Sequence, residues 1–261
     1  PIELKRMKYE IDIKLLIEPS FIKYVKISTP RIAPIRPPIK INIPENIINS
    51  CIQRRGKTHV YNKINYKKTA LVVIDMQNSW VAPGLSILGI PEAKTIVPNI
   101  NSIGKALRSV GGHVAWTQST FDDPWTKTMY KGFCDEKVIT QMMADSKIGS
   151  FGFEIWKEMD VKGEDIISKK TRPSALIQGS SDLDASLKKR GVQTLIITGT
   201  LTNACCESTT RDAVALGYNV IFVSDGTATR SDFEHNATLV NLMQLVADVR
   251  DTKSVLSLLK V

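Results

Sequence analysis

The sequence predicts an α/β fold: a doubly wound, mostly parallel six-stranded sheet with helices on both faces, preceded by an extended N-terminal arm. Two features of residues 69–261 predict the sheet. Short β-rich runs alternate with amphipathic stretches, and several of those runs are continuously apolar, as expected for parallel strands buried on both faces. A change of composition near residue 68 predicts the arm.

The elements of the sheet follow from local pattern. The expected strands are residues 69–76, 113–118, 165–169, 194–199, 219–224 and a sixth near 247–250. Apolar residues at helical spacing between strands mark helices around Ile96, Ile100, Ile103 and Leu107, around Leu183 and Leu187, and around Val240, Leu242, Leu245 and Val246. Sites in such sheets form outside the carboxyl ends of the strands, so functional residues are expected there.

The first 68 residues differ from the rest in charge. They contain 15 Lys and Arg against 5 Asp and Glu, whereas residues 69–261 contain 20 against 21. The net charge of +9 therefore originates in this N-terminal segment. We divide the chain into a basic extension, residues 1–68, and one large domain, residues 69–261.

Alternation predicts a strand over residues 9–14 and a second over 21–28, whereas the proline-rich run from 30 to 44 is expected to be extended. Helical spacing predicts a helix over 45–56 that stops at Gly56. The arm either packs on protein, its own or a neighbouring subunit, or is a solvated extension, or binds an anionic partner. Its scattered basic residues match no nucleic-acid-binding motif, which argues against a nucleic-acid partner.

Composition excludes several classes of protein. With 43 % hydrophobic and 23 % charged residues, the chain has the composition of a globular protein, and no apolar run approaches the ~20 residues of a membrane helix. Charged residues interrupt residues 1–20, so no secretory signal is expected. Four unevenly spaced cysteines indicate free thiols and a cytoplasmic location. Three histidines, none at zinc-binding spacing, predict no metal and no other cofactor.

Three reactive residues fall at the ends of three predicted strands: Asp75, Lys170 and Cys205. Each has a structural alternative, as a turn carboxylate, a solvated lysine and a buried thiol. A thiol at the start of a helix has its thiolate stabilised by the helix dipole, which predicts a lowered pKa for Cys205. Together the three residues are the set needed for a nucleophile, a base and a cation.

Three motifs carry a resemblance to a known family, the isochorismatase-like cysteine hydrolases. They are L-V-V-I-D-M-Q-N at residues 71–78, K-T-R-P-S at 170–174 with Asp182 and Leu183 downstream, and G-T-L-T-N-A-C-C-E-S-T-T-R-D-A at 199–213. The match covers nearly all of the chain after residue 68. The resemblance implies an isochorismatase-like fold with Asp75, Lys170 and Cys205 as catalytic residues.

The resemblance also implies their roles. Cys205 attacks a carbonyl or amidine-like carbon, Asp75 takes the thiol proton and passes it to the leaving amine, and Lys170 holds both charges. The Thr200–Leu201 peptide bond is expected to be cis, and the backbone N–H groups of Leu201 and Cys205 are expected to form an oxyanion hole. Cys206 is expected to be structural.

Branches of the family differ in substrate. Cys205 favours amide or ureide hydrolysis, because the isochorismatases proper resemble this fold without a nucleophilic cysteine. Metal-dependent nicotinamidases resemble it with an Asp-x-His pair, whereas residues 116–124 contain no histidine. The expected activity is metal-independent hydrolysis of a small linear amide or ureide (N-carbamoyl, ureido or maleamate-type) through a thioester-like acyl-enzyme.

Such substrates usually carry a carboxylate or a second carbonyl. Arg230 is the first candidate to bind it, with a plain surface arginine as the alternative, and Arg172 is the second unless it only supports the Lys170 loop. Gln118, Phe121 and Trp80 are expected to line the pocket.

Two other functions stay open: an isochorismatase-type ether or ester hydrolase on the same fold, and a catalytically idle scaffold whose basic arm binds an acidic partner. Relatives of this family form dimers or tetramers, so a homodimer or homotetramer is expected, with the arm strapped across a neighbouring surface.

Overall fold

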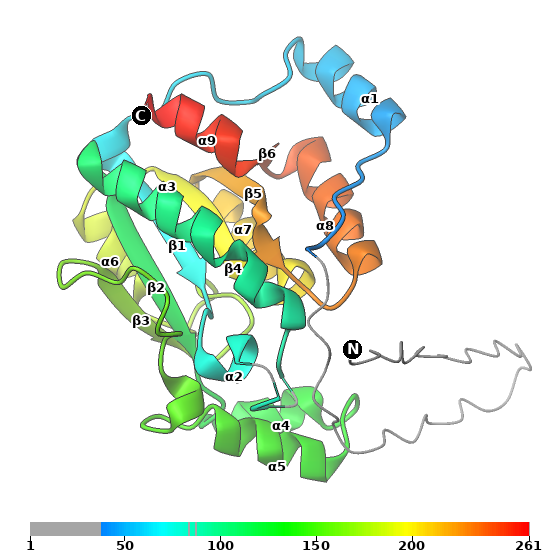
Figure 1. The fold of residues 1–261 in the computed structure, drawn as a ribbon, viewed down its shortest axis with the longest axis vertical. Coiled ribbons are helices and arrows are strands. Elements are labelled where there is room, and N and C mark those ends of the chain that lie inside the picture. The colour runs from blue at the N-terminus through cyan, green and yellow to red at the C-terminus, as the bar shows by residue number, and fades with distance from the viewer. Residues whose placement is uncertain (1–37, 83, 87, 261) are drawn as a thin grey trace, which may run out of the picture.

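The computed structural model describes residues 38–82, 84–86 and 88–260. Their core is one six-stranded sheet in which all pairings are parallel, in the order β3-β2-β1-β4-β5-β6. The strands are β1 (Thr69–Ile74), β2 (His113–Ser119), β3 (Ile166–Lys170), β4 (Thr194–Thr200), β5 (Asn219–Ala228) and β6 (Asp248–Arg250). The predicted fold class is confirmed, and the strand order reverses direction between β1 and β4 (Figure 1).

Alternate residues of β1 supply two separate apolar cores. Leu71 and Val73 belong to one core, together with residues of α3 (Val97–Ser109) and α9 (Thr252–Leu259). Ala70, Val72 and Ile74 belong to the other, together with residues of α6 (Leu183–Lys189), α7 (Glu207–Ala215) and α8 (Asp232–Leu245). Because both faces of β1 are covered, its sequence is continuously apolar.

The remaining helices are α1 (Glu45–Arg55), α2 (Asn78–Val81), α4 (Pro124–Tyr130) and α5 (Glu136–Asp145), with 3₁₀ turns at Tyr66–Lys68, Pro91–Ile96 and Phe151–Phe153. No sequence pattern predicted α4 and α5. They are short and are set by aspartate caps, because Asp123 accepts from the Trp125 N–H and Asp135 from the Lys137 N–H.

The ends of two strands differ from expectation. β1 ends at Ile74 rather than residue 76, because Asp75 turns the chain with a φ of 51°. β5 continues to Ala228 rather than residue 224, past an irregularity in its pairing with β4. In α8 the expected apolar stripe is also wrong at one position: Leu242 is buried, but Leu245 is 82 % exposed at the C-terminal end of the helix.

β4 approaches β1 very closely where the strand order reverses. Gly199 has a φ of 109°, and a Cβ built there would lie 2.1 Å from the carbonyl oxygen of Ile74. Glycine is therefore required for both its φ and its missing side chain. This contact sets the backbone spacing beside Asp75.

The described part of the arm packs on its own chain. The predicted helix over 45–56 is confirmed as α1, with Gly56 in the left-handed conformation as its C-cap. Cys51 of α1 is buried and its thiol donates to the Met243 carbonyl of α8 over 3.7 Å. Upstream, the Lys40 N–H donates to Asp232 over 3.0 Å, and Asn236 binds the backbone at positions 40 and 42.

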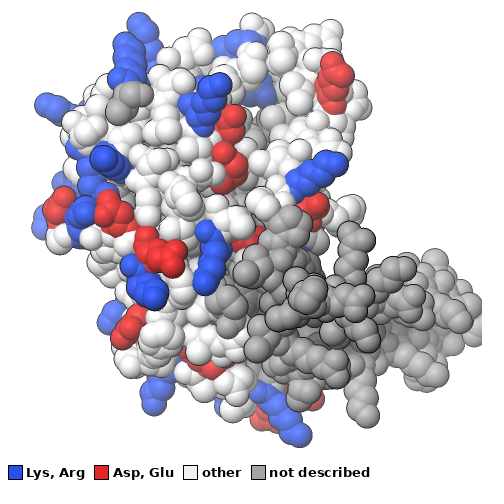
Figure 2. All heavy atoms as spheres, viewed as in Figure 1, with Lys and Arg blue, Asp and Glu red and all other residues white. Residues whose placement is uncertain are grey.

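The predicted strands over residues 9–14 and 21–28 lie outside the described residues. No helix within residues 38–82, 84–86 and 88–260 is long and apolar enough to span a membrane. On the described part of the face in Figure 2, basic and acidic side chains are interspersed.

Candidate active site

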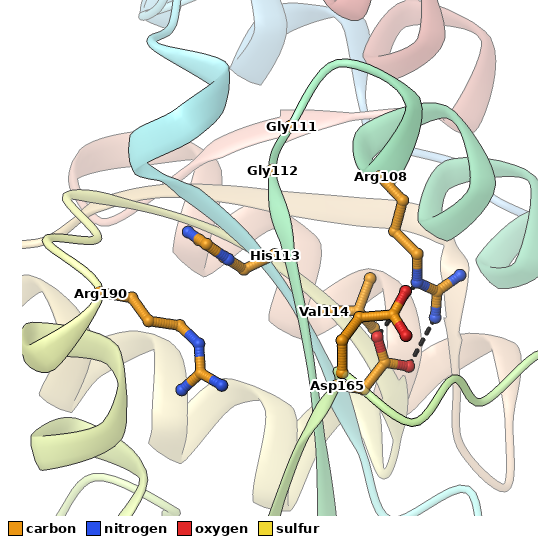
Figure 3. Close-up of a pocket in the computed structure, with 8 residues that line it drawn as sticks. Arg108, Gly111, Gly112, His113, Val114, Asp165 and Arg190 are labelled. Carbon is orange, nitrogen blue, oxygen red and sulfur yellow. Dashed lines mark hydrogen bonds and ion pairs between the residues drawn. The ribbon is translucent and has the colours of Figure 1, made fainter.

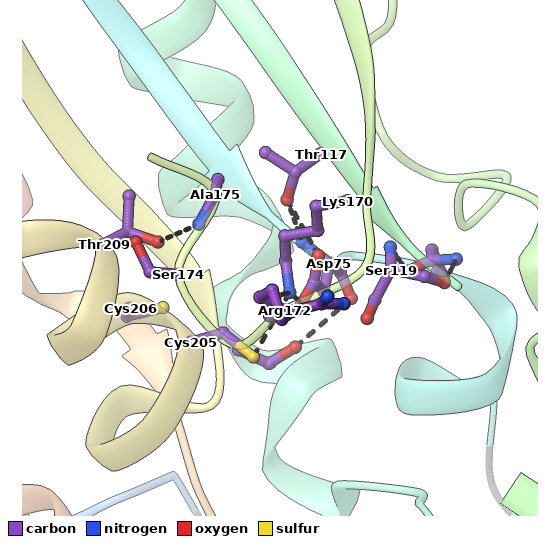
Figure 4. A network of polar contacts seen from close by, with 12 residues as sticks. Asp75, Thr117, Ser119, Lys170, Arg172, Ser174, Ala175, Cys205, Cys206 and Thr209 are labelled. Atoms are coloured by element: carbon purple, nitrogen blue, oxygen red, sulfur yellow. Dashed lines mark hydrogen bonds and ion pairs between the residues drawn. The ribbon is translucent and has the colours of Figure 1, made fainter. Parts of the chain in front are cut away.

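The carboxyl ends of β1, β3 and β4 bring Asp75, Lys170 and Cys205 into contact (Figure 4). The Lys170 Nζ lies 2.8 Å from Asp75 Oδ2 and 3.4 Å from Cys205 Sγ. The side chains of Asp75 and Lys170 are fully buried, and Cys205 is 9 % exposed. The ammonium group of Lys170 therefore bridges a carboxylate and a thiol.

Neighbouring strands fix the carboxylate. The Thr117 hydroxyl on β2 donates to Asp75 Oδ1 over 2.8 Å, and the Asp75 N–H donates to the Thr117 carbonyl oxygen over 3.3 Å. On the other side, the Thr200 hydroxyl donates to the Asp75 carbonyl over 3.2 Å. These contacts leave Oδ2 directed at Lys170.

A third acceptor completes the surroundings of the ammonium. The carbonyl oxygen of Arg172 accepts from Lys170 Nζ over 3.0 Å, so the ammonium has two hydrogen bonds, to Arg172 and Cys205, beside its ion pair with Asp75. Burial by itself would lower the pKa of Lys170, but the negative charge of Asp75, together with Cys205 where that thiol is ionised, outweighs it and raises the pKa above its ordinary value. Lys170 is therefore a cation at neutral pH.

Cys205 lies in a π-helical turn, Thr202–Cys206, that leads into α7. The expected lowering of its pKa is wrong: burial raises the pKa of Cys205 to about 11, the cation of Lys170 opposes this, and Asp75 adds to it. The physical reason is that burial removes water from the thiolate, and the charge of Asp75 offsets part of the attraction of Lys170. Cys205 rests as a neutral thiol and needs a base to lose its proton.

The loop after Lys170 is anchored to the helix after Cys205. Ser174 caps the turn by accepting from the N–H groups of Leu176 and Ile177. The Ala175 N–H donates to the Thr209 hydroxyl of α7 over 3.0 Å. The segment at residues 170–175 thus connects the end of β3 to α7.

Three aromatic side chains pack edge to face next to this group. Trp80 and Phe121 lie 6.5 Å apart between ring centroids, and Phe121 and Tyr130 lie 5.8 Å apart. Burial raises the pKa of Tyr130 to about 12, and the negative charges of Cys205 and Asp75 add to this. Tyr130 was not among the predicted site residues, because it lies on a short helix that the sequence did not predict.

Comparison with known proteins shows the family of the chain. Residues 69–254 match the family model of the isochorismatase domain. A relative in Bacillus subtilis, the uncharacterized isochorismatase family protein YwoC, is 32 % identical over 203 residues, which are 76 % of this chain and 97 % of the relative. The chain belongs to the isochorismatase family.

Solved structures of hydrolases have the same fold. A cysteine hydrolase from Pseudomonas syringae pv. phaseolicola aligns with a TM-score of 0.69 and 26 % identity over 78 % of this chain and 98 % of its own. An N-carbamoylsarcosine amidase from Thermoplasma acidophilum aligns with a TM-score of 0.57 and 26 % identity over 71 % of this chain and 96 % of its own. The predicted resemblance to isochorismatase-like cysteine hydrolases is confirmed.

Two of the predicted pocket residues, Gln118 and Arg172, bind other parts of the protein through their side chains. Gln118 is buried, and its amide donates to the Phe153 carbonyl over 2.9 Å. The Arg172 guanidinium donates to Asp123 over 2.8 Å and lies 4.2 Å from the Trp125 ring centroid.

Arg230 is exposed just beyond β5, and its guanidinium donates to the Leu88 carbonyl over 3.5 Å. Arg230 thus binds Leu88 and Gln118 binds Phe153, whereas Asp75, Lys170 and Cys205 contact one another. Arg172 does reach the site, through its backbone carbonyl.

Two hollows on the described surface lie away from this group. One, of about 180 Å³, is at the amino ends of β2 and β3, the opposite edge of the sheet, where Arg108 forms an ion pair with Asp165 (Figure 3). The other, of about 420 Å³, runs between the segment at residues 40–44 and α8. Among the described residues no three His, Cys, Asp or Glu side chains are grouped to hold a metal ion.

Proposed function

We propose that this protein is a metal-independent cysteine amidohydrolase that cleaves a small linear amide or ureide. One observation carries the proposal: a single buried ammonium group, Lys170 Nζ, contacts both the carboxylate of Asp75 and the thiol of Cys205. A carboxylate and a thiol brought together by a cation are a base and a nucleophile held in position.

In the first half of the reaction, Cys205 Sγ attacks the carbonyl carbon of the substrate while its proton passes to Asp75. The carbonyl π electrons move to the oxygen, which the N–H groups of Leu201 and Cys205 bind as an oxyanion. The thiol is neutral at rest, so proton transfer accompanies attack. The tetrahedral intermediate then collapses: the C–N bond breaks, Asp75 gives its proton to the leaving nitrogen, and a thioester-like acyl-enzyme remains.

In the second half, water attacks the acyl carbon and transfers one proton to Asp75. The C–S bond breaks, and Asp75 returns the proton to Cys205 Sγ. Lys170 is protonated in the resting site, because the carboxylate of Asp75 that it contacts outweighs burial and raises its pKa. Its role is to hold the carboxylate and the sulfur at a fixed separation.

Two observations support an amide or ureide as substrate. A similar protein, from Thermoplasma acidophilum, is an N-carbamoylsarcosine amidase. The thiol also has Asp75 beside it as a carrier for the proton that a leaving amine needs.

The proposal is tested by ammonia release from a panel of N-carbamoyl, ureido and maleamate-type amides. We expect Cys205→Ala to lose at least about 10³-fold in kcat because no other strong nucleophile is in the set. Cys206→Ala is the matched control: its thiol donates to the Thr198 carbonyl over 3.8 Å, away from Lys170, and it should keep most of the activity. Activity that survives in Cys205→Ala but not in Cys206→Ala would overturn the assignment.

The same assay separates the alternatives. Activity should persist in EDTA, and its loss with recovery on adding zinc would contradict a metal-independent mechanism. Turnover of vinyl ethers or esters without amide turnover would favour the ether or ester hydrolase. No turnover of any substrate by a correctly folded protein would favour the idle scaffold.

A further inference from the structure

Two hydrogen bonds hold the turn that carries Cys205 against α8 and the end of β5, and a third joins α8 to the start of α7. The Thr202 hydroxyl lies 2.9 Å from His235 Nδ1, and the Thr229 hydroxyl donates to Asn203 over 2.6 Å. Just after the turn, the Thr238 hydroxyl donates to Glu207 over 2.8 Å. The mechanism above uses none of these residues.

His235 stands out because it is a polar ring in an apolar position. It is fully buried on α8, one turn before Leu239 in the apolar core. Burying an imidazole is costly unless the ring forms hydrogen bonds. The contact with Thr202 is the one well-formed hydrogen bond that the ring makes within the described residues. A histidine here thus serves the bond to Thr202 rather than the packing of α8.

The state of the ring follows from its surroundings. Burial lowers the pKa of His235 to about 4, against smaller opposing effects of the Ser224 backbone and Asp232, so the ring is neutral at pH 7. The Ser224 backbone opposes the lowering of this pKa, as a carbonyl near a ring N–H does, and we assign that N–H to Nε2 because Nδ1 contacts Thr202. A proton on Nε2 leaves Nδ1 as an acceptor, and the Thr202 hydroxyl then donates to it.

Thr202 lies between the two residues that are proposed to bind the oxyanion. Thr202 directly follows Leu201, one of the two proposed oxyanion donors, and the turn that begins at Thr202 contains Cys205, the other. The N–H groups of Ala204 and Cys206 both bind the Leu201 carbonyl, so the turn is one closed unit. A tether at Thr202 therefore fixes both donors relative to α8.

We propose that His235 is a positioning residue: its neutral ring, through the Thr202 hydroxyl, holds the turn that presents the nucleophile and the oxyanion donors. The catalytic part of this proposal rests on the proposed function. Proton transfer by His235 is not involved, because its ring contacts Thr202 and not the reacting groups.

The test compares variants that keep or remove this one bond. Thr202→Val and His235→Phe remove the donor and the acceptor with little change of shape, and each should lower kcat by about 10-fold or more with KM within about two-fold. Thr202→Ser keeps the hydroxyl and His235→Asn keeps an acceptor near Nδ1, so both should recover most of kcat. The double variant should be no worse than either single one.

Thr238→Val is the matched control, since it removes an equally buried hydroxyl from the same helix contact without touching the turn, and its kcat should be unchanged. Alkylation of Cys205 by iodoacetamide needs no oxyanion hole, so its rate in Thr202→Val should stay within about three-fold of the wild type. Unchanged kcat in both Thr202→Val and His235→Phe would overturn the proposal, as would equal losses in Thr238→Val.

A measurement without turnover separates this inference from the proposed function. Hydrogen exchange of the peptide that covers residues 201–206 should be faster in Thr202→Val than in Thr238→Val, and ¹⁵N NMR should find His235 neutral with its proton on Nε2 at pH 7. If no amide is hydrolysed but both results hold, the proposed function fails and the tether stands. Unchanged exchange, or a proton on Nδ1, would overturn the tether whatever the activity.

Discussion

At the scale of single residues, the site is controlled by charge balance. Lys170 is a buried cation whose charge is balanced by Asp75. The effect of burial on the pKa of Cys205 is therefore larger than the attraction of the thiolate to Lys170. A cysteine at the start of a helix is ordinarily activated by the dipole, but here desolvation decides the direction of the pKa. The site therefore keeps its nucleophile as a thiol and its base as a carboxylate.

This balance predicts the pH dependence of alkylation at Cys205. With a pKa raised to about 11, only a small fraction is thiolate at pH 7, and that fraction grows about ten-fold per pH unit up to the pKa. We expect the iodoacetamide rate at Cys205, followed by peptide mass spectrometry, to rise in that proportion between pH 7 and 10. A rate that is already constant above pH 7 would contradict the raised pKa.

Two variants should shift that profile in opposite directions. Asp75→Asn removes the charge that raises the thiol pKa and leaves Lys170 to stabilise the thiolate, so alkylation at pH 7 should become faster while ammonia release is lost. Lys170→Met removes the cation, so alkylation should become slower. Changes in the same direction in both variants would indicate a general disturbance of the site instead of the charge effect.

At the scale of elements, the site depends on how closely β4 lies against β1. Gly199 allows this approach, and the strand then leads through Leu201 into the turn with Cys205. The Thr200 hydroxyl binds the Asp75 carbonyl across the same junction. The segment before Cys205 is thus bound to the backbone of Asp75 through Thr200, in addition to the contacts that both side chains make with Lys170.

Gly199→Ala should therefore be far more damaging than another substitution at a positive φ. Gly217 has a φ of 88°, and a Cβ added there would have nothing within 4 Å, so Gly217→Ala should cost only the strain of that φ, about 1–2 kcal/mol. Gly199→Ala adds a backbone clash with Ile74 and should lose several kcal/mol more or fail to fold. Urea unfolding measures both, and equal losses would show that β1 and β4 separate easily.

At the scale of the whole molecule, the sheet topology assembles the site from residues far apart in the chain. Asp75, Lys170 and Cys205 meet because parallel strands end at one edge, next to the point where the strand order reverses. The described part of the arm lies along α8, the helix whose His235 contacts the turn at Thr202. Its Ile43 packs against the second core, whereas Ile41 remains exposed.

Truncation should separate the parts of the arm. Deleting residues 1–56 removes the α1 contact with α8 and the burial of Cys51, worth about 2 kcal/mol, which corresponds to a fall in Tm of about 4–8 °C. Deleting residues 1–37 leaves every described contact and is the control for Tm. Equal melting temperatures for the two truncations would show that α1 contributes nothing to stability.

The same pair tests the predicted assembly. We expect light scattering to show a homodimer or homotetramer. If the arm is strapped across a neighbouring subunit, the deletion of residues 1–37 should lower the number of subunits in the oligomer. If the number of subunits is the same in the deleted and the full-length protein, residues 1–37 do not hold the oligomer together.

The sequence predicted the fold closely because its signals are local and consistent. Continuous apolar runs separated by helical periods determine a doubly wound parallel sheet, and each of the six strands lies within a few residues of its expected place. The helix before Gly56 was equally predictable from its spacing and its stop signal. The helices α4 and α5 were not, since both are short and their caps are ordinary aspartates.

By itself, the sequence determined the order of the elements, the family and the three residues at the strand ends. Only the tertiary structure decided their electrostatics: that Asp75 neutralises the charge of Lys170, that the thiol pKa rises, and that Arg172 contacts the site through its carbonyl. It also revealed Tyr130 and the tether from His235 to Thr202. The reason is physical: a pKa and a hydrogen bond depend on burial and on distances of a few ångströms between residues far apart in the chain, which no local pattern encodes.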